Sequence, residues 1–357
     1  MVDLGQESNL IDHVTLKVPT ISKDVEEHNE YFVQKPDALG KMGLHPLLKI
    51  TAALRMLAYG CAADCNDEYL QLSETTSMDS MDNFCNSIVS LYESEYLRHP
   101  TVEDLERLMK IGQKRGFPGM LGSLDCMHWE WKNCPSGWKG QFQGKEKLFL
   151  KRLHQPICGS GMPGSHNDIN ILDSSPLFKN LQNGVAPRCN YTINNHKYTM
   201  GYYLTDSIYP DWATMVKTLT QPQGLEQKHY AKKQEAYRKD VERTFGVLQA
   251  RFAIVSRPAR GWKHHNLANI MKTCVILHNM IVEDEREQKF NYDYDIDEHA
   301  VVTTVEVLHP VDMVSPSRID FDRFLSNYQE IRDVETHFQL RNDLIKHLWD
   351  LKGRSSE

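Results

Sequence analysis

The chain has 357 residues, of which 40% are apolar and 25% charged, values typical of a soluble globular protein with room for about two domains. Its first residues lack the basic and apolar stretches of a signal peptide, and no apolar run approaches the roughly 18 residues that a membrane span needs, so we expect an intracellular protein without a membrane contact. The net charge of −7 argues against a protein that coats nucleic acid along its whole surface.

The N-terminal third is predicted to be helical. Residues 1–28 are polar and unpatterned, which indicates a loose arm, and residues 29–112 form a predicted helical domain. Its helices are expected at 46–60, 67–72, 76–97 and 101–112. Pro46 and Thr101 carry start signals, and Ser73 or Thr75 could cap the third helix. Short helices joined by short turns are typical of a helix-turn-helix unit, or of a plain bundle that packs on the next domain.

Residues 113–285 show an α/β pattern. Met120–Trp131 is a short apolar and aromatic run that predicts a buried strand, and strands are also predicted at 191–193 and 198–204. Long helical patterns follow at 226–252 and 267–285. Residues 286–357 are interpreted as an acidic linker followed by a C-terminal helix at 321–352. The overall prediction is an α/β fold preceded by a helical domain.

Three carboxylates stand out by their settings. Asp125 ends the predicted strand, Asp168 lies in a turn that runs into a helix start, and Glu242 borders an apolar helical stripe. Hard divalent cations prefer oxygen ligands, and two such ions can activate water and stabilise the leaving oxygen of a phosphodiester. Turn or cap roles for the two Asp residues, and an ion pair of Glu242 with Arg238, are the commoner uses of such residues.

The most basic stretch of the chain surrounds Glu242. Ten Lys or Arg and three Asp or Glu lie between Lys228 and Lys263, a balance of +7. Lysine and arginine side chains beside a metal site can bind the DNA backbone. The segment therefore predicts phosphate contacts from Lys232, Lys233, Arg238, Lys239, Arg243 and Arg251.

Several long motifs give these residues a common meaning. The segments Gly122–Pro135, Pro163–Leu172 and Asp240–Phe252 resemble, in order, the first-Asp, second-Asp and Glu signatures of Harbinger-type transposases of plants. Segments 200–210 and 277–285 also match, and the resemblance runs from about residue 31 to 349.

The resemblance implies an RNase H-like domain with a DDE metal site made by Asp125, Asp168 and Glu242, with Mg²⁺ or Mn²⁺ as cofactor and DNA cleaved in the nucleus. It also implies a Myb-like partner protein for sequence recognition. Asp206, in the segment 200–210, is a second-tier metal ligand in this interpretation. The ordinary role of such a residue is that of a loop Asp before a Pro turn.

One segment departs from the family pattern. Between 144 and 161 the family has two apolar strands, whereas here the sequence is basic and interrupted by Pro156. A family-like peptide written in ordinary codons and read in a shifted frame yields residues 149–161. We therefore expect a damaged central hairpin, with 145–161 poorly ordered or not in strands.

The departure opens a second hypothesis for the function. A damaged hairpin predicts a weakened or inactive nuclease, and it favours a non-catalytic nuclear protein that binds chromatin partners. The presence of all three carboxylates favours the enzyme.

Overall fold

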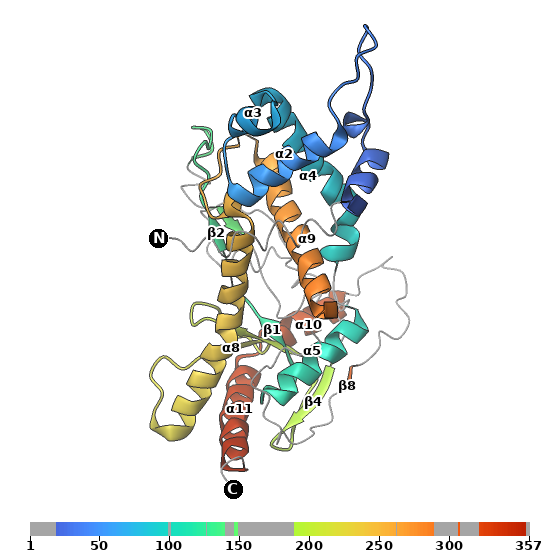
Figure 1. Cartoon of the computed structure of the whole chain (residues 1–357). Coiled ribbons are helices and arrows are strands. Elements are labelled where there is room, and N and C mark those ends of the chain that lie inside the picture. The colour runs from blue at the N-terminus through green and yellow to red at the C-terminus, as the bar shows by residue number, and fades with distance from the viewer. Residues whose placement is uncertain are drawn as a thin grey trace.

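A computed structural model describes residues 19–98, 101–125, 127–139, 146–148, 189–261, 263–288, 306–307 and 321–354. The N-terminal helices of residues 46–96 lie at one end of the molecule, two of the small sheets lie with the C-terminal helices toward the other, and the long helix α8 (Gly224–Arg251) runs between them (Figure 1). None of the helices in these ranges is long and apolar enough to cross a membrane. The fold is mixed α/β with a small parallel sheet.

Local signals in the sequence place the N-terminal helices. Helix α2 (Pro46–Tyr59) has Pro at its first position, and Gly60 ends it with a left-handed φ of 57°. Ser73 caps α4 (Glu74–Tyr96), and Thr101 with Asp104 forms the capping box of α5 (Val102–Lys114). The remaining short elements here are η1 (Glu30–Phe32) and α3 (Cys65–Leu70).

Helix α4 packs between α2 and α9 (His264–Gln288), a helix from much later in the chain. Phe84 and Ile88 of α4 are fully buried, and Thr273 of α9 donates to the carbonyl oxygen of Cys85 at 3.3 Å. This arrangement favours the bundle over a free helix-turn-helix unit, because both long faces of α4 are covered. Helix α9, which belongs to the predicted domain 113–285, thus packs against helices of the predicted domain 29–112.

The expected loose arm is wrong for its last part. Residues 19–28 are helical, and Ile21 and Val25 are buried in the main core. These two side chains are four residues apart and so share one helix face, a pair too short to stand out as a periodic pattern. Residues 1–18 lie outside the described residues.

The parallel sheet has the order β1-β6-β7, made by β1 (Met120–Ser123), β6 (Tyr202–Thr205) and β7 (Met215–Lys217). In the pairing of β1 with β6, Ser123 lies opposite Leu204. The single strand expected over 120–131 is two strands, because the chain leaves the sheet after Ser123 and re-enters a separate pairing as β2 (Met127–Trp129).

A second sheet holds a hairpin. Strands β4 (Cys189–Ile193) and β5 (His196–Tyr198) pair across Asn194 and Asn195, whose positive φ angles of 48° and 69° are those that a tight two-residue hairpin turn requires. The two-residue strand β8 (Glu306–Val307) pairs with β4. The strand expected over 198–204 is divided near Gly201, where a Cβ atom would lie 2.6 Å from Leu121 Cγ.

The expectation of a non-strand segment at 145–161 is wrong for Glu146–Leu148. These residues form β3, which pairs antiparallel with β2, with Met127 opposite Leu148 and Trp129 opposite Glu146. They precede the frame-shifted peptide, and Pro156 lies well beyond them, so nothing in their sequence prevents pairing. Residues 149–161 lie outside the described residues, and the prediction stays open there.

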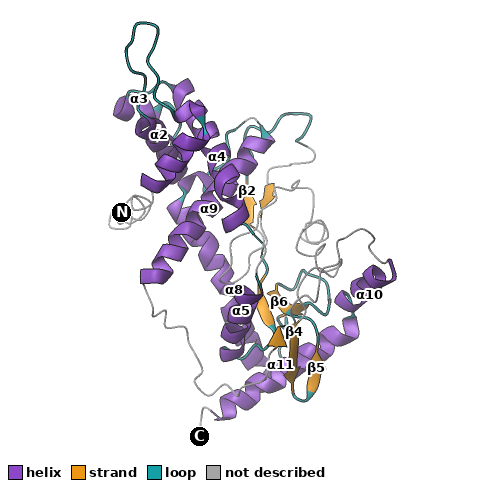
Figure 2. Cartoon of the chain, turned by 90° about the vertical axis from the view of Figure 1, so that its right-hand side faces the viewer, coloured by secondary structure: helices purple, strands orange, loops and turns teal. Residues whose placement is uncertain are grey.

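The C-terminal helical pattern is two helices, α10 (Phe321–Ile331) and α11 (Val334–Arg354). Asp333 separates them and accepts hydrogen bonds from the Glu335 amide at 3.0 Å and the Thr336 hydroxyl at 2.6 Å. Helix α11 packs against α8, β7 and β4 (Figure 2). One apolar core extends from Ile21, in the helix of residues 19–28, to Leu348 in α11. The short helix η2 (Ala253–Val255) follows α8 and contributes Val255 to this core.

Candidate active site

Asp125 and Asp206 lie at one edge of the parallel sheet. Asp125 is two residues past the end of β1, and Asp206 is the first residue past β6. The strands are neighbours and run the same way, and the Leu124 amide donates to the carbonyl oxygen of Leu204 at 2.9 Å. Continuing this register by two residues brings Asp125 level with Asp206. Two partly buried carboxylates thus leave the carboxyl ends of adjacent strands, where open α/β sheets bind ligands.

The turn after β6 fixes the Asp206 side chain. Its Oδ1 accepts from the Ser207 amide at 2.6 Å, and the Tyr209 amide donates to its carbonyl oxygen at 3.3 Å. Beneath this turn, Lys217 donates to the carbonyl oxygen of Tyr209 at 3.0 Å and pairs with Asp211 at 2.6 Å. Asp206 is therefore held close to the sheet edge by backbone and side-chain contacts.

Glu242 lies on α8, and its side chain is 48% exposed. It pairs with Arg238 at 3.2 Å, the i, i+4 contact that its sequence also allowed. Gln249 lies seven residues further, on the same face of the helix and about 10 Å along its axis. The Gln249 amide donates to Sδ of Met127 at 3.5 Å, two residues past Asp125. The face of α8 that carries Glu242 therefore borders the segment that carries Asp125.

Contacts between α8 and the residues just before β1 fix how α8 lies against the sheet. Asp240 pairs with Arg115 at 2.9 Å, and the Arg115 guanidinium lies 3.8 Å from the ring centroid of Tyr237. Tyr237 in turn packs edge-on against Phe117 with centroids 5.3 Å apart. Deeper in the sheet, Gln234 donates to the carbonyl oxygens of Thr205 and Val216, at 3.2 and 3.3 Å. The buried stripe expected along α8 is confirmed, since Val241, Phe245, Leu248 and Phe252 are all buried.

The segment after Asp125 is held by a basic loop, residues 257–261. The indole nitrogens of Trp129 and Trp131 donate to the carbonyl oxygens of Arg257 and Gly261, at 2.8 and 2.7 Å. The Lys132 amide donates to the carbonyl oxygen of Ala259 at 2.9 Å. Arg257 and Arg260 are exposed on this loop, so positive charge lies beside the strand that follows Asp125.

The predicted basic residues of α8 divide into two kinds. Lys232, Lys239 and Arg243 are exposed, and Lys233 is half-buried. Arg238 is engaged by Glu242. Arg251 is only 16% exposed and pairs with Glu285 of α9, while its guanidinium lies 3.3 Å from Nδ1 of His278. These contacts join α8 to α9, so we do not expect Arg251 to contact DNA.

Asp125 and Glu242 are the two members of the predicted triad that the structure describes. Asp168 lies outside the described residues, and its role remains a prediction. Within the ranges that the structure describes, no group of three or more His, Cys, Asp or Glu side chains is gathered closely enough to hold a metal ion. Asp206, the second-tier candidate, lies at the sheet edge with Asp125, and no local sequence pattern reveals that β6 lies next to β1.

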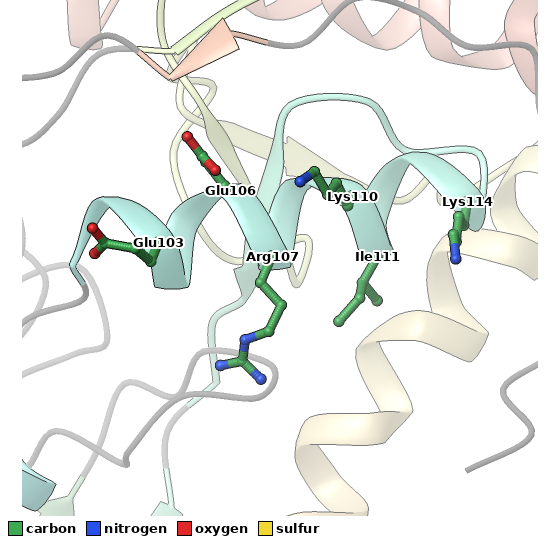
Figure 3. Close-up of a pocket in the computed structure, with 6 residues that line it drawn as sticks. All are labelled: Glu103, Glu106, Arg107, Lys110, Ile111 and Lys114. Carbon is green, nitrogen blue, oxygen red and sulfur yellow. The ribbon is translucent and has the colours of Figure 1, made fainter. Parts of the chain in front are cut away.

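A separate pocket of about 340 Å³ lies along α5 (Figure 3). Its described lining is Glu103, Glu106, Arg107, Lys110, Ile111 and Lys114. Acidic side chains lie toward the N-terminal end of the helix and basic ones toward its C-terminal end, as the helix dipole favours (Figure 3). The candidate carboxylates do not line it, so we assign no chemistry to this pocket.

Comparison with known proteins decides the family. The model of a family described as plant transposon protein matches residues 94–289, more than half of the chain. The chain belongs to this family. Asp125, Asp168, Asp206 and Glu242 all lie within the matched residues. The proposed resemblance to Harbinger-type transposases is confirmed at this level.

Curated relatives point the same way at low identity. The chain is 23% identical over 257 residues to a protein of Bos taurus named "Putative nuclease HARBI1", with 67% of this chain and 68% of the relative covered. The proteins of the same name from Homo sapiens and Rattus norvegicus are 22% and 20% identical over the same shares of each chain. No solved structure matches the chain.

Proposed function

We propose that this plant transposon family protein is a divalent-cation-dependent DNA nuclease with an RNase H-like core. The observation that carries the proposal is the placement of Asp125 and Asp206 at the ends of adjacent parallel strands. The family match and the nuclease name of the relatives support it. Exposed Lys and Arg side chains on α8 would contact the phosphates of DNA.

The donor set fits Mg²⁺ or Mn²⁺, since Asp125, Asp168 and Glu242 are all carboxylates and hard cations prefer oxygen. These three would hold the cation, with Asp206 as a further candidate ligand, and Glu242 would release Arg238 to do so. A bound cation would activate water and stabilise the leaving oxygen of the phosphodiester. The protein's own contribution is to fix the two Asp side chains by the sheet register and by the Ser207 turn.

A cleavage assay on duplex DNA with Mg²⁺ or Mn²⁺ tests the proposal. Asp125→Asn, Asp168→Asn and Asp206→Asn should each lower the rate by more than about 100-fold, beyond the loss from a residue that only supports a metal ligand. Asp67→Asn, an exposed Asp on α3, is the matched control and should leave the rate unchanged. Full activity in Asp206→Asn would remove Asp206 from the ligand set, and full activity in Asp168→Asn would remove Asp168.

The second candidate is a non-catalytic nuclear protein that binds DNA and chromatin partners. One observation favours it: Glu242 is paired with Arg238. In that case the wild-type protein would bind DNA without cleaving it in any divalent cation. Both candidates place the protein in the nucleus, and both allow a Myb-like partner for sequence recognition.

A further inference from the structure

A cluster of basic side chains lies where α8 meets α11, away from the candidate carboxylates. On α8, His229, Lys232 and Lys233 have i, i+3 and i+4 spacing, so they share one helix face. The His229 ring packs edge-on against the Trp349 ring of α11, with centroids 6.2 Å apart. Lys352 Nζ lies 4.8 Å from the centroid of the same indole. We call these five residues the α8–α11 patch.

The lysines of the patch repel a proton on His229. Burial lowers the pKa of His229, and the positive charges of Lys352, Lys233 and Lys232 lower it further. Three cations from two helices therefore act on one imidazole. Glu226 is the acidic residue one turn earlier on the same side of α8.

Gathering like charges does not help the two helices to pack. Helices α8 and α11 already pack against each other, and α11 buries Leu344 and Leu348 in the main core. Lys232 and Lys352 are exposed, so each could reach solvent elsewhere. An anion that bound the patch would relieve the repulsion, and the flat Trp349 ring would hold Lys352 in place while it did so.

We propose that the α8–α11 patch is a phosphate-binding site for the backbone of duplex DNA, outside the catalytic edge. The proposal rests on the proposed function for its choice of DNA. From His229 to Glu242 the helix rises about 20 Å, and His229 and Lys233 lie on a different face of α8 from Glu242. The patch would therefore contact duplex DNA apart from the cleaved phosphodiester. Trp349 and Lys352 lie beyond the residues that the family model matches.

The test is equilibrium binding of the full chain to a 30-base-pair duplex in buffer with a metal chelator, over a range of salt. The patch variant is Lys232→Gln with Lys352→Gln, and the matched control is Lys41→Gln with Lys346→Gln, two exposed lysines outside the patch. Lys346 is on α11, so it controls for a change in that helix. The patch variant should lower the slope of log K against log salt by about 2, and the control should not.

An unchanged slope in the patch variant, or an equal fall in both variants, would overturn the proposal. So would competition by polyglutamate that equals competition by duplex DNA. Because no cation is needed for binding, the result is separate from the cleavage test. If the patch variant bound DNA more weakly and the wild-type protein cleaved no DNA, the patch proposal would be supported and the nuclease proposal would be wrong.

Discussion

At the scale of single residues, His337 is a buried base beneath the loop that carries Asp206. Its side chain has no exposed surface, Nδ1 lies 3.0 Å from the carbonyl oxygen of Trp212, and Nε2 lies 3.3 Å from Asp211 Oδ1. Burial lowers the pKa of His337, and this effect exceeds the opposing ones of the Trp212 carbonyl and the Asp211 charge. The neutral imidazole is therefore the form that the fold favours.

This lowered pKa makes the fold sensitive to acid. Because the folded pKa lies below the unfolded value of about 6.5, the unfolded chain binds more protons, and stability falls as pH drops below about 6.5. His337→Asn keeps an amide donor near the Trp212 carbonyl but cannot titrate. Urea unfolding at pH 7.5 and 5.5 should show a smaller loss of stability in this variant than in the wild type, by up to about 1 kcal/mol.

The control for the acid effect is His28→Asn, a change at an exposed histidine. It should leave the pH dependence as in the wild type, where the pKa values of His229 and His264 are also lowered, chiefly by burial. An equal pH dependence in wild type and His337→Asn would show that His337 does not stay neutral in the fold.

The candidate site shows what residue patterns can and cannot predict. Asp125 was predicted from its local setting, because an apolar run followed by an acid indicates a strand end. The importance of Asp206 depends on β6 lying beside β1, a pairing between residues some 80 positions apart. Such a pairing leaves no periodic signal at Asp206 itself, where the local sequence indicates only a turn.

At the scale of secondary-structure elements, the position of α8 depends on the ion pair of Asp240 with Arg115. Arg115 and Asp240 are 14% and 17% exposed, and Asp240 also pairs with the exposed Arg243. Asp240→Ala would remove the carboxylate that pairs with the largely buried Arg115 guanidinium. We expect this loss to lower the free energy of unfolding by about 1–3 kcal/mol. Urea unfolding of the variant measures this cost.

Arg243→Ala removes the other partner of Asp240 and provides the comparison. Its side chain is largely exposed, so solvent screens the pair, and the expected loss is below about 0.5 kcal/mol. If both variants lost the same stability, the Arg115 pair would have no special role in holding α8.

Helices were predicted more closely than strands for a physical reason. The starts of α2 and α5 depend on residues within one turn, Pro46 and Thr101, and these signals were read directly from the sequence. The ends of β1 and β5 depend on where distant strands and side chains lie, as at Gly201 beside Leu121. The break between α10 and α11 depends on Asp333, whose capping role was hidden inside a continuous helical pattern.

At the scale of the whole molecule, segments far apart in sequence share one core. Helix α9 packs against α4, and α11 packs against α8 and the sheets, so the first, middle and last parts of the chain contribute to a single apolar cluster. The four-part division predicted from composition follows changes in sequence pattern. It does not follow separate cores, because composition does not record which faces pack together.

This shared core predicts that residues 94–289, which the family model matches, do not fold alone. Outside that range, α11 buries Leu340, Leu344 and Leu348, each worth about 1.5–3 kcal/mol when fully buried. Burial of the three leucine side chains together stabilises the fold by roughly 5–9 kcal/mol, which is comparable with the 5–15 kcal/mol by which domains are stable. A chain of residues 1–320 should therefore lose cooperative thermal unfolding. Adding the peptide 321–357 should restore it, whereas a truncated chain that melts like the whole protein would show that the core closes without α11.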